Sequence, residues 1–212
     1  MTSTSERPRL AAGQTAEGDI ASFLARTESV GALAQDGYLA GHDGRAIAQR
    51  LRRPELVQAL SFSVCHSARP DTDRFYQDDE EEVADWRRRR AQTIRDHCAV
   101  CPVRAACAEL ALRDEDVYGV RGGLPEEKLA VRLATDAKRL EQARTDDDRA
   151  EQLRSERLDA EREVRRLALM HTSLRASQAT RDENNAEVRA AVQERDAKKT
   201  AHRLAAGWAV AA

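Results

Sequence analysis

The sequence has few aromatic side chains and no long hydrophobic run. Only 4% of its 212 residues are Phe, Trp or Tyr, while 34% are charged, and the mean hydropathy is -0.68. So little bulky apolar material excludes a large globular core, and a small core often needs a metal, a disulfide or a partner. No window is long and apolar enough to span a bilayer, so we expect no membrane contact.

The sequence also has no large excess of positive or negative charge and no secretory signal. The formal net charge is -2, so the chain as a whole is not a basic nucleic-acid binder, and contact with DNA would need a local patch. The N-terminus lacks the basic stretch and apolar core of a secretory signal. We therefore expect a cytoplasmic protein. In that compartment, clustered cysteines more often bind a metal or carry redox chemistry than form disulfides.

Cysteine is scarce, but the four cysteines lie close together in the sequence. Cys98, Cys101 and Cys107 follow the spacing C-x2-C-x5-C, and Cys65 lies 33 residues before the first of them. The close three can reach one metal centre from neighbouring turns, and Cys65 can join them if the intervening chain folds back. Four thiolates suit tetrahedral zinc or the corners of an iron–sulfur cluster, and the spacing leaves both open. Ordinary buried cysteines or a disulfide pair are the weaker explanation.

The residues around the cysteines show helical periodicity. Residues 83–98 predict one helix, and the acidic residues 78–82 stand before it, where they suit the helix dipole. A second helix is predicted with Pro102 at its first position, which would place Cys101 at a helix N-terminus and stabilise its thiolate. The glycines within 119–123 predict a turn.

Composition and predicted helices divide the chain into five segments. They are a disordered tail (1–18), a helical N-terminal extension (19–60), the cysteine-containing domain (61–124), a long charged helical arm (125–206) and a short tail (207–212). The predicted fold class is therefore all-α.

The arm carries a partial heptad repeat. Its first seam consists of Leu153, Ala160, Leu167, Leu174 and Val188, and its second of Val164 and Val192. This pattern predicts a long helix or a weak coiled coil that could mediate self-association, and a single solvated or partly disordered helix stays open. The run TDDD at 145–148 predicts a break or a new helix start.

The cysteine spacing together with the stretch ELALRDEDVYGVRGGLPEE resembles the WhiB-like proteins of actinobacteria and their phages. That family has one distant cysteine, then C-x2-C-x5-C, then a glycine turn usually written G-V/I-W-G-G and an acidic step. The turn corresponds here to Gly119, Val120, Arg121, Gly122 and Gly123. The segment PDTDRFYQ also looks like the family's D-P-x-x-F-F-P. The resemblance covers about residues 60–135.

The resemblance implies a small all-helical domain wrapped around a [4Fe-4S] cluster. Its ligands would be Cys65, Cys98, Cys101 and Cys107. Family members are transcriptional regulators whose clusters respond to oxygen or nitric oxide, and several bind the primary sigma factor of RNA polymerase, DNA or both. The turn at 119–123 would then face sigma factor.

Two departures from the family pattern affect the expected contacts with sigma factor and DNA. Arg121 replaces the usual tryptophan of the turn, and an arginine there predicts stacking on an aromatic ring or pairing with an acidic group. Residues 126–203 carry 18 basic and 17 acidic side chains, so the arm is a poor phosphate-binding tail and suits self-association or a protein partner better. The basic run at 86–90 is interpreted as a solvated helix face, partly paired with the acidic residues before it, with Trp86 in the core.

Two other functions remain as alternatives. One is a structural zinc module on a coiled-coil scaffold, which needs the same four thiolates. The other is a thiol–disulfide reductase that uses Cys98 and Cys101 once the cluster is lost. The sequence around that pair shows no thioredoxin-like βαβ pattern, so we expect a protein that is not an enzyme.

Overall fold

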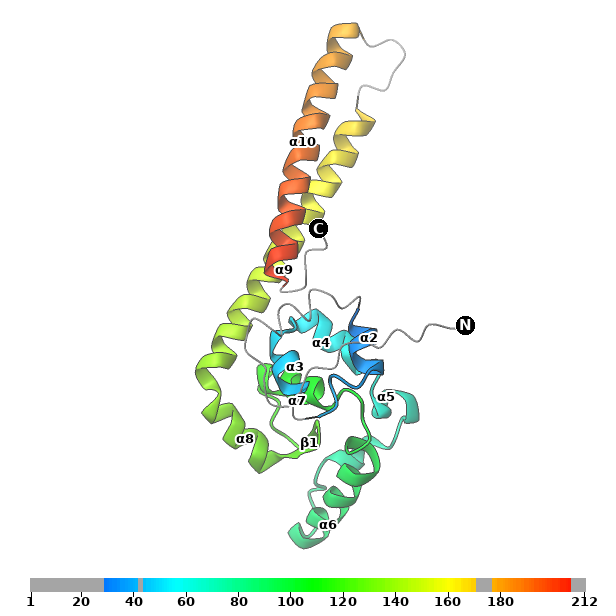
Figure 1. Ribbon diagram of the computed structural model, residues 1–212, viewed down its shortest axis with the longest axis vertical. Helices are drawn as coiled ribbons and strands as arrows, with labels where there is room; N and C mark the ends of the chain where they lie inside the picture. Colours follow the sequence, from blue (N-terminus) through cyan, green and yellow to red (C-terminus); the bar gives the residue numbers. More distant parts are fainter. Residues whose placement is uncertain (1–28, 42–43, 171–176, 207–212) are drawn as a thin grey trace, which may run out of the picture.

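The computed structural model describes residues 29–41, 44–170 and 177–206. Within these ranges a helical body carries a projecting pair of long helices (Figure 1). The predicted tails at 1–18 and 207–212 lie outside the described residues, as does Leu174 of the predicted seam. None of the described helices is long and apolar enough to cross a bilayer.

Three short helices open the described chain. They are α2 (Val30–Gln35), α3 (Gly44–Arg50) and α4 (Arg53–Leu60). Ser29 caps α2, because its hydroxyl accepts a hydrogen bond from the Ala32 N–H at 3.2 Å. Pro54 stands in the first turn of α4, where its missing N–H has no helical partner to lose.

The cysteine-containing segment follows as a chain of short elements. They are α5 (Val64–Ala68), the 3₁₀ helix η1 (Thr72–Phe75), α6 (Val83–Thr93), the π turn η2 (Ile94–Cys98) and α7 (Arg104–Arg113). The predicted helix that ends near Cys98 is confirmed, and its last turn is widened to a π turn.

The predicted start of the second helix at Pro102 is wrong. Helix α7 begins at Arg104, and Val103 before it has φ -122° and ψ 26°. Val103 is fully buried. Two residues further on, the Ala105 N–H donates a hydrogen bond to the Leu39 carbonyl at 2.8 Å. This docking against the N-terminal helices holds the backbone at Val103 out of helical geometry, so Cys101 lies before the helix.

A small hairpin connects α7 to the arm. Strand β1 (Val120–Arg121) pairs antiparallel with β2 (Leu124–Pro125), with Val120 opposite Pro125 and Arg121 opposite Leu124. Gly122 and Gly123 have φ of +56° and +74°, as a two-residue hairpin turn requires. The turn predicted from the glycines is thus confirmed, and it interrupts a fold that is otherwise helical.

The arm consists of three helices. They are α8 (Glu126–Thr135), α9 (Ala137–Leu169) and α10 (Gln178–Ala205). The break predicted at 145–148 is wrong, because α9 runs through these residues. The carboxylate of Asp147 is buried there and accepts hydrogen bonds from Arg113 and from the Arg53 N–H. It therefore serves tertiary contacts, among them the first N–H of α4, and does not start a new helix within α9.

Helix α10 lies antiparallel beside the C-terminal part of α9, and together they form a helical hairpin (Figure 1). Ala160 and Leu167 are buried in α9, and Val188 and Val192 of α10 are half-buried. The predicted coiled-coil seam is therefore covered within one chain, by a helix that turns back.

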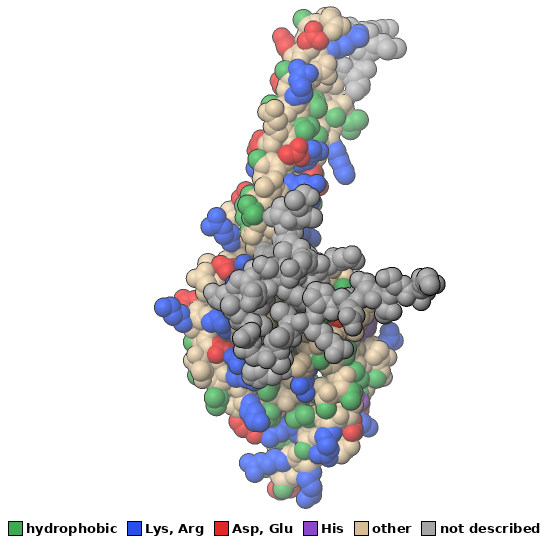
Figure 2. All heavy atoms as spheres, in the orientation of Figure 1, with side chains coloured by type: hydrophobic (Ala, Val, Ile, Leu, Met, Phe, Trp, Pro, Cys, Tyr) green, Lys and Arg blue, Asp and Glu red, His purple; other side chains and the backbone are tan. Residues whose placement is uncertain are grey.

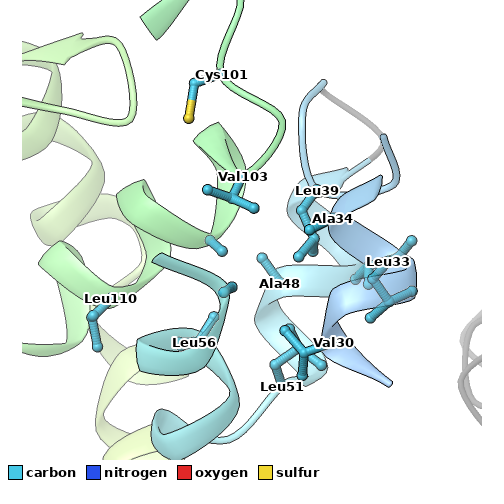
Figure 3. Packing of buried hydrophobic residues seen from close by; sticks show 13 residues of the cluster. Val30, Leu33, Ala34, Leu39, Ala48, Leu51, Leu56, Cys101, Val103 and Leu110 are labelled. Atoms are coloured by element: carbon cyan, nitrogen blue, oxygen red, sulfur yellow. The ribbon is translucent and has the colours of Figure 1, made fainter. Parts of the chain in front are cut away.

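The main core joins the N-terminal helices to α7 (Figure 3). Leu33, Leu51 and Leu56 are buried with Val103 and Leu110 in this one cluster. Residues 30–60 thus share a core with the helix that carries Cys107. Two smaller clusters are present as well. One consists of Trp86, Cys98 and Val120, and the other of Leu112, Leu129 and Leu140, between α7, α8 and α9.

Candidate metal centre

The four cysteines line one cavity, with a volume of about 510 Å³. Cys65 comes from α5, Cys98 from the π turn, Cys101 from the connection that follows, and Cys107 from α7. The chain between the first two cysteines folds back, as the spacing requires. Apolar side chains such as Leu60, Phe75 and Val120 make up much of the remaining wall.

Local sequence places Cys65 and Cys98. Ser63 caps α5 by accepting a hydrogen bond from the His66 N–H at 3.0 Å, and Arg69 ends the helix in a left-handed conformation with φ 44°. Cys65 therefore occupies a short, fixed helical turn. At the other wall, the Ala99 N–H donates to the Ile94 carbonyl at 2.8 Å and closes the π turn, in which Cys98 is buried.

The glycine turn approaches the thiols directly. The Gly122 N–H donates to the Cys107 sulfur at 3.2 Å, and the Gly123 N–H lowers the pKa of Cys98 by hydrogen bonding. A Cβ at Gly122 would lie 2.4 Å from the Arg104 carbonyl oxygen. Only glycine lets the backbone come this close while holding a positive φ.

Burial controls the acidity of the thiols. It raises the pKa of Cys98 to about 11 and that of Cys107 to about 12. Burial also raises the pKa of Cys65. Without a metal these three thiols are protonated at neutral pH, so binding a metal as thiolates would release protons.

Arg121 stands at the rim of the cavity and is held on two sides. Its guanidinium lies 5.0 Å from the centre of the Tyr76 ring and donates a hydrogen bond to the Asp116 carboxylate at 2.7 Å. It also donates to the Tyr76 hydroxyl. Arg121 thus makes an aromatic and an acidic contact within the chain.

The basic run of α6 is mostly a solvated, paired face, as predicted. Trp86 is buried, and the guanidinium of Arg89 stacks over its ring at 4.9 Å. Arg89 also pairs with Glu81 at 2.8 Å, and Arg90 with Glu127 at 2.7 Å. Arg87 and Arg88 are exposed.

The four thiols share one cavity. All four thiols are free. In the described ranges, no three His, Cys, Asp or Glu side chains are grouped to hold a single metal ion. The thiols instead line a cavity whose wall includes His97, and the Nε2 atom of this histidine is buried without a hydrogen-bond partner in the structure as described.

Sequence reasoning missed several residues of the cavity wall. Tyr76, His97 and Arg104 all line the cavity, and only Tyr76 had a signal, since it falls within the segment PDTDRFYQ. The sequence analysis assigns no role to His97, which adjoins Cys98 in the sequence. Arg104 follows Val103 at the start of α7, and no motif in the sequence marks it.

The comparison with protein families gives one match for this chain. Residues 62–130 match the family model described as Transcription factor WhiB. The matched range contains the four cysteines, the glycine turn and the start of α8, which confirms the resemblance. Comparisons with curated proteins and with solved structures give no match.

Proposed function

Residues 62–130 of this chain are WhiB-like, which indicates a transcription factor, and we propose that it regulates transcription through a [4Fe-4S] cluster. The proposed ligands are Cys65, Cys98, Cys101 and Cys107. The proposed signal is oxygen or nitric oxide, and the proposed target is sigma factor of RNA polymerase.

The arrangement of the thiols carries the proposal. They line one cavity of about 510 Å³, which leaves room among them for a cluster of several atoms. A cubane cluster takes its cysteines at separate corners. The N–H of Gly122 directed at Cys107 is also of the kind that stabilises the negative charge of a bound cluster.

The cavity wall explains how loss of a cluster would change the protein. Neither α5 nor η1 contains a fully buried residue, and each packs on a core cluster through one partly buried side chain, Val64 and Phe75. A cluster bound to Cys65 would cross-link α5 to the body of the domain. Losing it would free the segment that leads to Tyr76, the stacking partner of Arg121.

The proposed docking face for sigma factor is the glycine turn with the residues beside it. Arg121 is held by Tyr76 and Asp116, so it presents a fixed cation where the family has an aromatic. Tyr118, one residue before the turn, is 72% exposed. Tyrosine and arginine are both common at the centres of protein interfaces.

The two alternative functions find less support in the site. A zinc module would use the same four thiols, but the match to the WhiB family favours a cluster. A thiol–disulfide reductase needs a thiol with a lowered pKa. Burial instead raises the pKa of Cys98 to about 11.

The test is to purify the full chain without oxygen and assay iron, sulfide and zinc beside the visible spectrum. We expect a brown protein with about four irons and four sulfides per chain. Each Cys→Ser variant should lose the colour, while Ser67→Ala, on the same helix as Cys65, should keep it. A colourless protein with one zinc per chain would refute the cluster.

The partner is tested separately, by pull-down of sigma factor with the wild type, Arg121→Trp and the four Cys→Ser variants. We expect the cysteine variants to lose binding together with the cluster. A cysteine variant that kept full affinity for sigma factor would show that the cluster does not control docking.

A further inference from the structure

A second cavity lies behind the glycine turn. It has a volume of about 250 Å³, and its wall includes Arg45, Arg104 and Arg132 with Gly122 and Gly123. It shares Arg104 and Gly122 with the cysteine cavity. The same turn therefore separates a cavity lined by thiols from one lined by guanidinium groups.

Among the described residues, the charges of this second cavity are not balanced. Glu109 is the one carboxylate among its described lining residues, and it is buried and already paired with Arg113 at 2.9 Å and Arg139 at 2.8 Å. Arg45 donates to Asp136 at 2.5 Å. Arg104 and Arg132 make no hydrogen bond or ion pair through their side chains to any described residue.

Arg132 shows the effect of this imbalance. Burial and the charge of Arg45 lower the pKa of Arg132, against the opposing effect of Asp136. A partly buried guanidinium close to a second one is stabilised most by an anion placed between them. Guanidinium groups bind phosphate and carboxylate oxygens in pairs, with good geometry.

We propose that this cavity binds a phosphate group, either free phosphate or the phosphate of a small monoester, between Arg45, Arg104 and Arg132. The volume of about 250 Å³ suits a small oxyanion, since sites for drug-sized ligands are mostly larger. The inference rests on the guanidinium groups and stands apart from the proposed cluster.

Arg104 connects the anion cavity to the cysteine cavity. Its Cδ lies 3.2 Å from where a Cβ of Gly123 would stand, so the side chain crosses the turn there. The charge of Arg104 also acts on the Cys98 thiol.

The test is calorimetric titration of the full chain with inorganic phosphate at constant ionic strength, with chloride as the reference salt. We expect saturable binding by the wild type and a dissociation constant raised at least about tenfold in Arg132→Gln. Arg149→Gln, an exposed arginine of α9, is the matched control and should bind as the wild type does. A parallel titration with glycerol phosphate distinguishes free phosphate from a monoester as the ligand. A site for monoesters should bind glycerol phosphate about as tightly as phosphate, whereas a site for free phosphate should bind it more weakly.

Two results would overturn the proposal. One is a wild-type response to phosphate no larger than the response to chloride. The other is equal affinity in Arg132→Gln and Arg149→Gln. Because Arg132 has no described ion pair to lose, the variant should fold, and circular dichroism checks this. Arg132→Lys, which keeps the charge, should retain part of the affinity.

Discussion

Gly122 performs two tasks that no other residue could combine. Its N–H reaches the Cys107 sulfur at 3.2 Å, and its backbone has φ +56° against the Arg104 carbonyl. A side chain at this position meets both a backbone strain and a steric clash. The two costs can be separated, because other glycines of the chain carry only one of them or neither.

Gly122→Ala should lower the free energy of unfolding by about 1–3 kcal/mol. Gly37→Ala is the matched control for strain alone, since Gly37 has φ +77° with nothing within 4 Å of its Cβ position. Gly41→Ala is the control with neither cost, because that glycine has no neighbour within 4 Å and no positive φ. Urea unfolding should show the largest loss of stability in Gly122→Ala, a smaller loss in Gly37→Ala and the smallest in Gly41→Ala. An equal loss in Gly122→Ala and Gly37→Ala would argue against the clash.

Glu55 makes the stability of the protein depend on pH. Its Oε2 atom is buried without a partner in the described structure, and burial, with a smaller contribution from Asp147, raises the pKa of its carboxyl group. A raised pKa in the folded state means that this group contributes stability at pH below its unfolded value, which is lost as pH rises through the folded value.

Glu55→Gln should therefore stabilise the protein at pH 7, by less than about 1 kcal/mol because water still reaches part of the group. At pH 4 and below the advantage should shrink, since the wild-type carboxyl is then protonated. Urea unfolding at the two pH values measures the difference. The exposed Glu80→Gln should show no such dependence, and a Glu55→Gln effect that stayed constant with pH would contradict this account.

At the scale of the elements, α7 connects the two halves of the molecule. One side carries Cys107 toward the cavity, and another carries Arg113, whose side chain is 1% exposed. Arg113 pairs with Glu109 of the same helix and with Asp147 of α9, both at 2.9 Å. It also donates to the Gln49 carbonyl of α3. The arm is thus anchored to the cysteine-bearing helix by a buried network of charges.

Arg113→Met should destabilise the protein by about 3–5 kcal/mol, because it leaves buried carboxylates short of a partner. Arg166→Met removes an exposed pair with Glu163 on the same arm and should cost less than about 1 kcal/mol. Thermal or urea unfolding compares the two. A similar small loss in both variants would mean that the network contributes little to the anchoring.

At the scale of the whole molecule, the arm returns to the body. The Arg52 guanidinium donates to the Ala205 carbonyl at the end of α10, at 2.9 Å, and also pairs with Asp146 of α9 at 3.4 Å. Along the hairpin, basic and acidic side chains are interspersed (Figure 2). The long helices therefore offer no continuous basic surface for DNA on the face shown, and their apolar seam faces inward.

A chain that ends at residue 170 would lack α10 and uncover Ala160 and Leu167 on α9. We expect this truncated chain to self-associate, since an exposed apolar seam finds another copy. Sedimentation velocity compares it with the full chain, and Leu167→Glu in the truncated chain should restore the monomer. If the truncated chain stayed monomeric, the seam would be too weak to drive association.

Much of the local structure was predictable because it depends on neighbouring residues. Helical periodicity placed the helix that ends near Cys98, and paired glycines placed the turn. Local signals failed where a distant contact competed with them. Val103 is drawn into the core ahead of α7, and Asp147 pairs with Arg113 in the middle of α9.

The sequence by itself identified the four candidate thiol ligands and the helical character of the chain. Four cysteines at a given spacing, a glycine turn and a heptad pattern are properties of short stretches, and each is visible there. Only the tertiary structure decided which stretches meet. It brought Cys65 to the other three thiols, joined residues 30–60 to α7 and folded the arm back on itself. These pairings depend on contacts across long separations in the chain, for which local periodicity holds no information.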